Sequence, residues 1–417
     1  LIANRSRCFQ GGAPVGEGFV LDEATARSML ADRTVDYSPV IRRYLVGEDI
    51  ATTPDQAPSR WIIDFNGRSL QDAALFPRAL DHLRATVKDL RATNADRYRR
   101  ENWWIDFVRG LSGVEIRDGA VSQAFVAPTS SCGHDHGDAA DAGWRYVPKN
   151  VVTTGRLSLA APVTVADFRH LQGATRRTAK VTIPSPTRLH FHGGRSGVSA
   201  TAYPDIEDFF ADVVKAYRAE IAALEDAGCR YIQIDDPLMT YFISDRMRAE
   251  VVAAGDDPEQ RLQRYVQLTN DCIAARRPGT AIGIHVCRGN SRSGWLAEGG
   301  YQRIAEAVLG GLKVDHFLLE YDDERSGDFA PLAQVPRGVK VVLGLVTTKF
   351  GRLEPAEDLV RRIEDASRHV PLEDLALSPQ CGFASTVEGN LITEDDQWRK
   401  LERIVEVART VWGGVSA

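Results

Sequence analysis

The sequence has few cysteines, no long apolar run and no excess of positive charge. Six cysteines are spread irregularly over 417 residues, which argues against a secreted disulfide framework and favours a cytoplasmic protein with free thiols. No uninterrupted apolar stretch of about 18 residues occurs, so we expect no membrane span. A formal net charge of −6 argues against binding of nucleic acid or membranes over the whole surface.

The start of the chain also lacks the apolar core of a signal peptide, since it reads LIANRSRCFQGG. Its first residue is Leu and not Met, and we therefore expect the sequence to be a fragment. Apolar residues make up 43% of the chain, which is enough for a sizeable core. The length suits one large barrel with a smaller domain, or two to three average domains.

From about residue 178 the chain alternates short apolar runs with amphipathic segments. The runs AKVTIP, CRYIQID, AIGIHVC, VDHFLLE, VKVVLGLV and DLALSP predict buried strands. Helical spacing of apolar residues predicts a helix over 205–227 that Gly228 ends, and a closing helix over 394–411. This alternation predicts an α/β fold with a parallel sheet, either a barrel or a doubly wound fold.

The first hundred residues follow a different pattern. YSPVIRRYLVGEDI and SRWIIDF are isolated strand-like runs, and a helix is predicted from Pro77 to about Arg100. This helix is rich in arginine, which indicates either a solvated face or a surface that contacts phosphates. We predict a small α+β segment that is distinct from the rest of the chain.

Ligand-type residues follow three of the predicted strands. His285 and Cys287 close the AIGIHVC run, Glu320 ends VDHFLLE, and Cys381 follows DLALSP. In a parallel barrel the carboxyl ends of the strands converge on one face. Cysteine, histidine and carboxylate side chains are the zinc ligands of proteins. The sequence therefore predicts a zinc site that is made by these four residues.

The other cysteines are weaker candidates. Cys229 and Cys272 fall within a predicted strand and a predicted helix, and are interpreted as core residues. Cys132 with His134 and His136 could bind a metal. A hydrophilic surface loop is the preferred interpretation of that tract.

Several stretches resemble the catalytic domain of cobalamin-independent methionine synthases over residues 101–417. They are WWIDFVRGLSGVEI, KVTIPSPTRLHFHGG, GCRYIQIDDP, HVCRGN, FLLEYDDERSGDFAPL, VVLGLVTTK and LSPQCGFAST. The shorter, single-barrel branch, 5-methyltetrahydropteroyltriglutamate–homocysteine methyltransferase-like, is the most similar. The resemblance implies a (β/α)8 TIM-type barrel and a zinc ion held by His285, Cys287, Glu320 and Cys381. It also implies methyl transfer from a methylated folate to the thiol of homocysteine, giving methionine.

The resemblance assigns roles to residues near other strand ends. Asp235, in IQIDDP, is expected to bind the amino group of the substrate. Asp236 stands where the larger enzymes have glutamate, and both aspartates are predicted as catalytic residues, with a helix N-cap as the alternative. His190 and His192 are interpreted either as substrate-binding residues in the donor pocket or as structural packing.

This chain departs from the family pattern at the residue that would protonate the leaving amine of the methyl donor. A methylated amine that loses its methyl group must be protonated. The larger enzymes have a histidine after the strand that reads VVLGLVTTK here, and this chain has none. Thr348 and Lys349 are the local alternatives, and Lys349 is also predicted to bind substrate.

Residues 1–100 resemble the target-recognition region of type II restriction–methylase fusion enzymes. The matching stretches are CFQGG, GFVLDEATARSML, VIRRYLVGEDI, DQAPSRWIIDF and FPRALDHLRATVK. We therefore expect a chimera, with a barrel that lacks its first strand and helix and with nucleic-acid contacts only through residues 1–100. Arg97 stands where the family has an acidic residue that helps to bind the amino group of the substrate.

Two other functions stay open at this point. One is a zinc-dependent alkyl- or methyltransferase with another thiol acceptor, such as coenzyme M, because zinc ligands recognise only the sulfur. The other is a DNA-binding fragment that is fused to an inactive barrel.

Overall fold

The computed structural model describes residues 20–44, 60–63, 75–86, 107–108, 110–118, 149–290, 293–385 and 389–413. The chain divides into two compact units, Leu1–Arg99 and Arg100–Ala417. Each unit is described by itself.

The first unit has an α+β arrangement. Its described strands, β1 (Val20–Leu21), β3 (Arg60–Ile63) and β2 (Ile41–Tyr44), pair antiparallel in that order. The helices are α1 (Glu23–Leu30) and α4 (Pro77–Thr86). The helix predicted from Pro77 is thus present as far as Thr86, and the remainder of that prediction lies outside the described residues. The likeness of this unit to a target-recognition region stays a prediction.

The second unit is built on a parallel sheet whose described strands have the order β11-β10-β9-β8-β7-β6. Each of these strands lies within one of the six predicted runs. They are β6 (Lys180–Pro184), β7 (Tyr231–Asp235), β8 (Ala281–Val286), β9 (His316–Glu320), β10 (Lys340–Val346) and β11 (Leu375–Pro379). Successive strands pair in parallel without a gap in the order.

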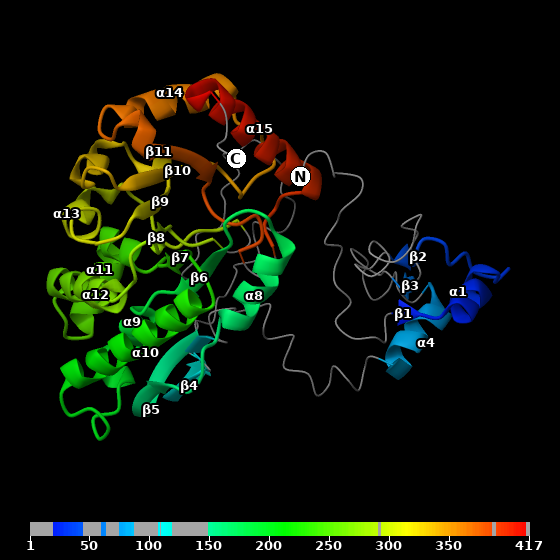
Figure 1. Cartoon of the computed structure of the whole chain (residues 1–417), viewed down its shortest axis with the longest axis horizontal. Helices are drawn as coiled ribbons and strands as arrows, with labels where there is room; N and C mark the ends of the chain where they lie inside the picture. Colours follow the sequence, from blue (N-terminus) through cyan, green and yellow to red (C-terminus); the bar gives the residue numbers. More distant parts are fainter. Residues whose placement is uncertain are drawn as a thin grey trace. The chain divides into compact units, whose positions relative to one another are not determined.

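Helices and short 3₁₀ turns connect these strands. The α-helices are α8 (Val165–Ala174), α9 (Arg188–Phe191), α10 (Ile206–Asp226), α11 (Asp245–Ala253), α12 (Pro258–Ile273), α13 (Ala305–Val308), α14 (Ala356–Ser367) and α15 (Glu394–Trp412). The 3₁₀ turns are η5 (Gly194–Gly197), η6 (Met239–Ile243), η7 (Tyr301–Arg303), η8 (Glu324–Ser326), η9 (Ala330–Gln334) and η10 (Leu372–Asp374). Figure 1 shows the strands in an arc with α10, α12, α13 and α14 on its outer side.

The alternation of residues along each strand explains why the helices cover one face. In β6, Val181 and Ile183 are buried in the core, whereas Lys180 and Thr182 line a cavity on the opposite face. Successive side chains of a strand point to opposite faces, so the apolar set packs under the helices. The longest described helix is α10, which Asp205 caps through a hydrogen bond from the Glu207 amide at 3.0 Å. Gly228, at φ +95°, follows its end.

The family resemblance implies a barrel that lacks its first strand and helix, and the described strands form an open parallel sheet. Among the described residues, β6 and β11 are the two edges of the sheet. A separate antiparallel hairpin, β4 (Leu111–Asp118) and β5 (Lys149–Leu159), precedes the sheet and was not predicted. Its second strand packs on α10.

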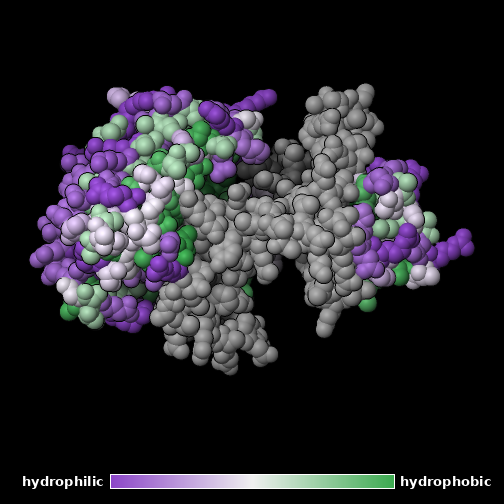
Figure 2. All heavy atoms as spheres, turned by 90° about the horizontal axis from the view of Figure 1, so that it is seen from below, coloured by the Kyte–Doolittle hydropathy of each residue, from purple (hydrophilic) through white to green (hydrophobic). Residues whose placement is uncertain are grey.

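On the face shown in Figure 2, hydrophilic side chains make up most of the outer surface of the described part of the second unit. Within the described part of the chain, none of the helices combines the length and the apolar character that a membrane crossing requires.

Candidate metal centre

Three ligand-type side chains meet at the carboxyl edge of the sheet. They are His285 in β8, Cys287 just after it, and Cys381 just after β11, and their ligand atoms all lie within 4.8 Å of one another. Cys381 Sγ is 3.6 Å from His285 Nε2. The imidazole and the first thiol are buried, and Cys381 is half-buried. Three of the four predicted ligands are therefore brought together from two strands that are not neighbours.

A close backbone contact lets Cys381 reach this position. Gly344 in β10 faces the chain just after β11, and a Cβ at this position would lie 2.7 Å from Gln380 Cα and 2.7 Å from Leu319 O. Any side chain at position 344 would therefore push the segment that carries Cys381 away from the sheet.

The three side chains strongly perturb one another. Hydrogen bonding to Cys287, to His285 and to Ser385 holds the pKa of the Cys381 thiol well below its usual value. The hydrogen bond with Cys381, together with burial, raises the pKa of Cys287 well above its usual value. Burial by itself would lower the pKa of His285, but Cys381 and the nearby carboxylates raise it to about 9. These shifts arise from the close contact of the three side chains with one another. An imidazole and two thiols form the donor set of soft or borderline metal ions.

Glu320, the fourth predicted ligand, is not part of this group. Its carboxylate is fully buried, and Oε2 accepts a hydrogen bond from the Arg288 amide at 2.6 Å. Its Oε1 accepts from Lys349 Nζ at 3.1 Å and from Arg325 Nη2 at 3.2 Å. Burial would raise the pKa of Glu320, but these cations hold it far below its usual value.

A cavity of about 480 Å³ adjoins the group and extends over the inner face of the sheet. Its lining includes Asp235, His285 and Cys381 at one end, and Lys180, Thr182 and Gln233 on β6 and β7. The volume lies within the range of small-molecule sites. Sequence reasoning missed Lys180, Thr182 and Gln233. Their alternation with buried apolar residues was the available signal, because polar residues at every second strand position mark the face opposite the core.

Asp235 lies in the cavity lining together with His285 and Cys381 of the metal group. It ends β7 in register with His285 of β8 and lines the cavity. Among the described residues, none donates a hydrogen bond to its carboxylate, and burial raises its pKa to about 6. The carboxylate is therefore available to a cationic group in the cavity.

Asp236 has a different environment. It is fully buried, and it accepts hydrogen bonds from the Ser185 hydroxyl, from the Thr187 hydroxyl at 3.1 Å, and from the amides of Leu238 and Met239 at 2.9 Å each. These bonds tie the segment after β6 to the turn after β7. Its carboxylate thus accepts from amides at the start of η6 (Met239–Ile243), whose N-cap is Leu238. The catalytic role and the capping role of Asp236 both stay predictions.

His190 and His192 lie in and just after α9, and neither is among the residues that line the cavity. His190 Nδ1 is 2.9 Å from the Tyr265 hydroxyl, and its ring packs 5.2 Å from that of Phe210. Burial lowers the pKa of both histidines to about 3. These contacts favour structural packing, which is one of the two interpretations of His190 that the sequence offered.

Thr348 and Lys349 follow β10 and also lie outside the cavity lining. The Thr348 hydroxyl donates to Gln380 Oε1 at 2.5 Å. Lys349 is fully buried between Glu320 and Asp322, and these carboxylates raise its pKa against the effect of burial. Arg97, Cys132, His134 and His136 lie outside the described residues.

Comparisons with known proteins point to one family. Residues 152–410 match the family model described as cobalamin-independent synthase, catalytic domain. Protein YxjH of Bacillus subtilis (strain 168) is 42% identical over 317 residues, which are 76% of this chain and 79% of that protein. The methionine synthase of Pyrococcus abyssi (strain GE5 / Orsay) is 25% identical over 257 residues, which are 61% of this chain and 64% of that protein.

Solved structures agree. A candidate vitamin-B12 independent methionine synthase from Listeria monocytogenes has a TM-score of 0.55 and 30% identity, over 91% of this chain and 98% of that chain. A B12-independent methionine synthase from Shewanella sp. W3-18-1, in complex with selenomethionine, has a TM-score of 0.53 at 18% identity, over 82% of this chain and 90% of that chain. The second likeness concerns the fold alone.

Proposed function

Because the chain belongs to the family of cobalamin-independent synthase catalytic domains and is a methyltransferase of the methionine synthase type, we propose that it methylates the thiol of homocysteine, with a methylated folate as donor and zinc as activating metal. The six parallel strands are proposed to belong to a (β/α)8-type barrel. The reaction is proposed to take place in the cytoplasm, where Cys287 and Cys381, both free, would stay reduced.

One observation carries this proposal: the approach of His285, Cys287 and Cys381 to within 4.8 Å at the edge of a cavity. These residues would hold the zinc ion, since nitrogen and thiolate sulfur are its preferred donors, and Glu320 is proposed as the fourth ligand. When bound there, zinc would lower the pKa of a substrate thiol and present its sulfur as a nucleophile at neutral pH.

Asp235 supports homocysteine over a thiol without an amino group. Its carboxylate lines the cavity beside His285 and Cys381, where it would pair with the ammonium of an amino acid whose thiol reaches the metal centre. Asp236 would hold the segment of Asp235 in place through its four hydrogen bonds. The methylated folate would enter the part of the cavity that is lined by Lys180 and Gln233, whose side chains are joined by a hydrogen bond.

Calorimetry tests the proposal. Homocysteine is titrated into zinc-loaded protein in two buffers of different ionisation enthalpy. We expect stoichiometric binding with release of one proton, because a thiol that binds zinc is deprotonated. Absence of both heat and proton release would rule out the proposed function.

The substitution Asp235→Asn tests the acceptor. We expect it to weaken homocysteine binding about 10- to 100-fold, the scale of a lost charge-assisted hydrogen bond of roughly 1.5–3 kcal/mol. The matched control is the same thiol without its amino group, 4-mercaptobutyrate, which should bind both proteins equally. Equal loss for the two thiols would favour another acceptor and a structural role for Asp235.

A further inference from the structure

The two thiols of the metal group differ in their access to the cavity. Cys381 is half-buried and lines the cavity, whereas Cys287 is 4% exposed and is not among the residues that line it. A methyl donor in the cavity would therefore meet the sulfur of Cys381 as well as the sulfur of the substrate. A thiolate attacks a methyl group readily. The proposed function thus requires that Cys381 be a weaker nucleophile than the substrate thiolate.

A hydroxyl group lies next to the sulfur of Cys381. Ser385 donates a hydrogen bond from its Oγ to Cys381 Sγ at 3.3 Å, and Gly382 O is also within reach of this hydroxyl, at 3.2 Å. A hydrogen bond to a charged acceptor is about twice as strong as one to a neutral acceptor, so the proton goes to the sulfur when that sulfur is a thiolate. Ser385 also lines the cavity. Donor and acceptor therefore both belong to the wall that a bound methyl donor would face.

Asn290 orients the hydroxyl of Ser385. This asparagine follows Cys287 by three residues and is 7% exposed. Its Nδ2 donates a hydrogen bond to Ser385 Oγ at 3.0 Å. Because the oxygen of Ser385 accepts this bond, its own proton points away from Asn290, toward the sulfur of Cys381 or toward Gly382 O.

The same asparagine joins the segments that carry the two thiols. Its Nδ2 also lies 3.2 Å from Thr348 Oγ1 and 3.4 Å from Gly382 O. The Thr348 hydroxyl in turn donates to Oε1 of Gln380, the residue before Cys381, at 2.5 Å. Asn290 thus reaches the chain on both sides of Cys381, directly at Gly382 and through Thr348 at Gln380. The backbone beside this sulfur is therefore fixed from the segment after β8, which carries the other thiol.

We propose that the Ser385 hydroxyl, oriented by Asn290, weakens Cys381 as a nucleophile and so directs the methyl group to the substrate thiol. Without this bond, the sulfur of Cys381 would attack the methyl carbon and the carbon–nitrogen bond of the donor would break. The electron pair of that bond would stay on the nitrogen, which takes up a proton from water. The product would be a neutral thioether at position 381, which lacks the negative charge of a metal-binding thiolate. The inference rests on the proposed function, because it requires zinc on Cys381 and a methyl donor in the cavity.

The physical reason is that the hydrogen bond and the attack use the same electrons. A hydrogen bond draws charge from the sulfur, and this bond weakens as the sulfur shares its electrons with the methyl carbon. An interaction that is stronger before the reaction than in the transition state slows the reaction. Ser385 is thus a positioning residue, which acts on the choice between two sulfurs through one metal ligand.

The test follows alkylation of the zinc-loaded full chain by iodoacetamide, in which the thiolate displaces iodide. Peptide mass spectrometry gives the rate at Cys381, with Cys287 in the same digest as internal reference. For Ser385→Ala we expect alkylation of Cys381 to be about tenfold faster, on the scale of one charge-assisted hydrogen bond. Ser385→Thr keeps the hydroxyl and should retain the wild-type rate. Asn290→Ala should also raise the rate, and the double variant should be no faster than Ser385→Ala, because both changes remove the same bond.

A spectrum separates this role from a merely structural one. In protein that is loaded with Co²⁺, the sulfur-to-metal charge-transfer band should move to longer wavelength in Ser385→Ala, because a sulfur without its hydrogen bond gives up an electron more readily. Ser385→Thr should keep the wild-type band. Ser378→Ala is the matched control for both measurements, because Ser378 lines the same cavity but donates to Pro379 O at 2.8 Å.

Each alkylation rate is measured at two concentrations of free zinc, because a rate that falls as zinc rises belongs to a thiol without metal. Equal rates for Ser385→Ala and wild type would overturn the inference, and so would a gain that disappears with added zinc. Should Asn290→Ala fail to fold, the variants of Ser385 alone decide. A wild-type chain that binds no zinc would refute the proposed function and the inference with it, whereas equal rates with zinc bound refute the inference alone.

Discussion

Gly344 allows the segment just before Cys381 to lie close to the sheet, because it has no side chain. We expect Gly344→Ala to weaken zinc binding and to lower the free energy of unfolding by about 1–3 kcal/mol, the scale of overpacking in a core. The added Cβ would meet two backbone atoms at 2.7 Å, and neither can turn aside as a side chain would. Chelator competition and urea unfolding measure the two effects. Gly173→Ala is the control, because a Cβ there meets nothing within 4 Å. Equal effects of the two substitutions would contradict this account of Gly344.

We expect His190 to make the folded protein less stable in acid. Burial, followed by the charges of Arg261, Arg195 and Arg264, lowers its pKa from 6.5 to about 3. Between these pH values the unfolded chain binds a proton that the folded chain does not bind. The free energy of unfolding therefore falls as the pH drops below about 6.5, by roughly 1.4 kcal/mol per pH unit for such a group.

The substitution His190→Asn should reduce this slope. We expect the variant to be less stable at pH 7, because the contact with Tyr265 is lost, but to lose less stability than wild type between pH 6.5 and 4.5. Urea unfolding at several pH values gives the two slopes. His369→Asn, at an exposed position, should leave the wild-type slope unchanged. A His190→Asn slope equal to that of wild type would show that other groups dominate.

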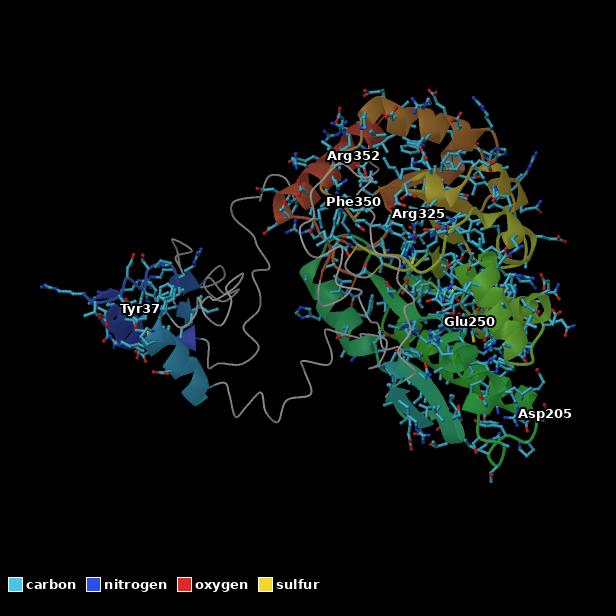
Figure 3. The ribbon with its side chains drawn as sticks, turned by 180° about the vertical axis from the view of Figure 1, so that it is seen from behind. Tyr37, Asp205, Glu250, Arg325, Phe350 and Arg352 are labelled. Carbon is cyan, nitrogen blue, oxygen red and sulfur yellow. The ribbon has the colours of Figure 1, made fainter. Side chains whose placement is uncertain are left out.

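At the scale of elements, the loop of residues 347–355 after β10 depends on a buried ion pair with α15. Lys400 Nζ donates to both carboxylate oxygens of Glu354, at 3.1 and 2.9 Å, and to Arg352 O. Glu354 in turn accepts from the Thr347 amide at 2.9 Å. Figure 3 labels Phe350 and Arg352 on this loop. The closing helix thus holds the segment that carries Lys349.

Removal of one partner of this pair should be costly. We expect Lys400→Met to lower the free energy of unfolding by about 3 kcal/mol, because Glu354 would keep a largely buried charge without its cation. Urea unfolding measures the loss. Lys215→Met, at a side chain that is 75% exposed beside Asp212, should change stability by less than about 0.5 kcal/mol. Similar losses for both would mean that the contact of α15 with the loop does not depend on this pair.

The elements also show what the sequence could and could not predict. The six strands of the sheet follow from their apolar runs, because every second residue is buried under helices, as Val181 and Ile183 are in β6. Strand ends likewise predict the approach of His285, Cys287 and Cys381. The buried ion pairs of Arg325 and Lys349 with Glu320 and Asp322 were beyond such reasoning. Arg325 lies in the short turn η8 and Lys349 lies in the segment after β10, and no periodicity specifies the paths of these connections. The same holds for the hairpin of β4 and β5, whose strands are far apart in sequence.

At the scale of the whole molecule, the two units have separate cores. In the described part of the chain, the hydrophobic cluster of the first unit includes Tyr37, Ile41 and Phe76, and it shares no residue with the clusters of the second unit. All donors of the metal group lie in the second unit. We therefore expect a chain of residues 100–417 to bind zinc with the stoichiometry of the full chain, as measured by metal analysis after gel filtration. Loss of zinc from the shorter chain would show that the first unit supports the centre.

The same pair of chains tests the alternative of nucleic-acid binding. The resemblance of residues 1–100 to a target-recognition region predicts that any affinity for duplex DNA belongs to the first unit. Contacts to phosphates release counterions, so such binding must weaken steeply as salt rises. We expect fluorescence anisotropy with a labelled duplex, at low and at physiological salt, to give salt-dependent binding for the full chain and none for residues 100–417. The overall charge of −6 makes binding of DNA by the whole surface unfavourable. DNA binding by the shorter chain would assign the affinity to the second unit and would contradict the prediction that it belongs to residues 1–100.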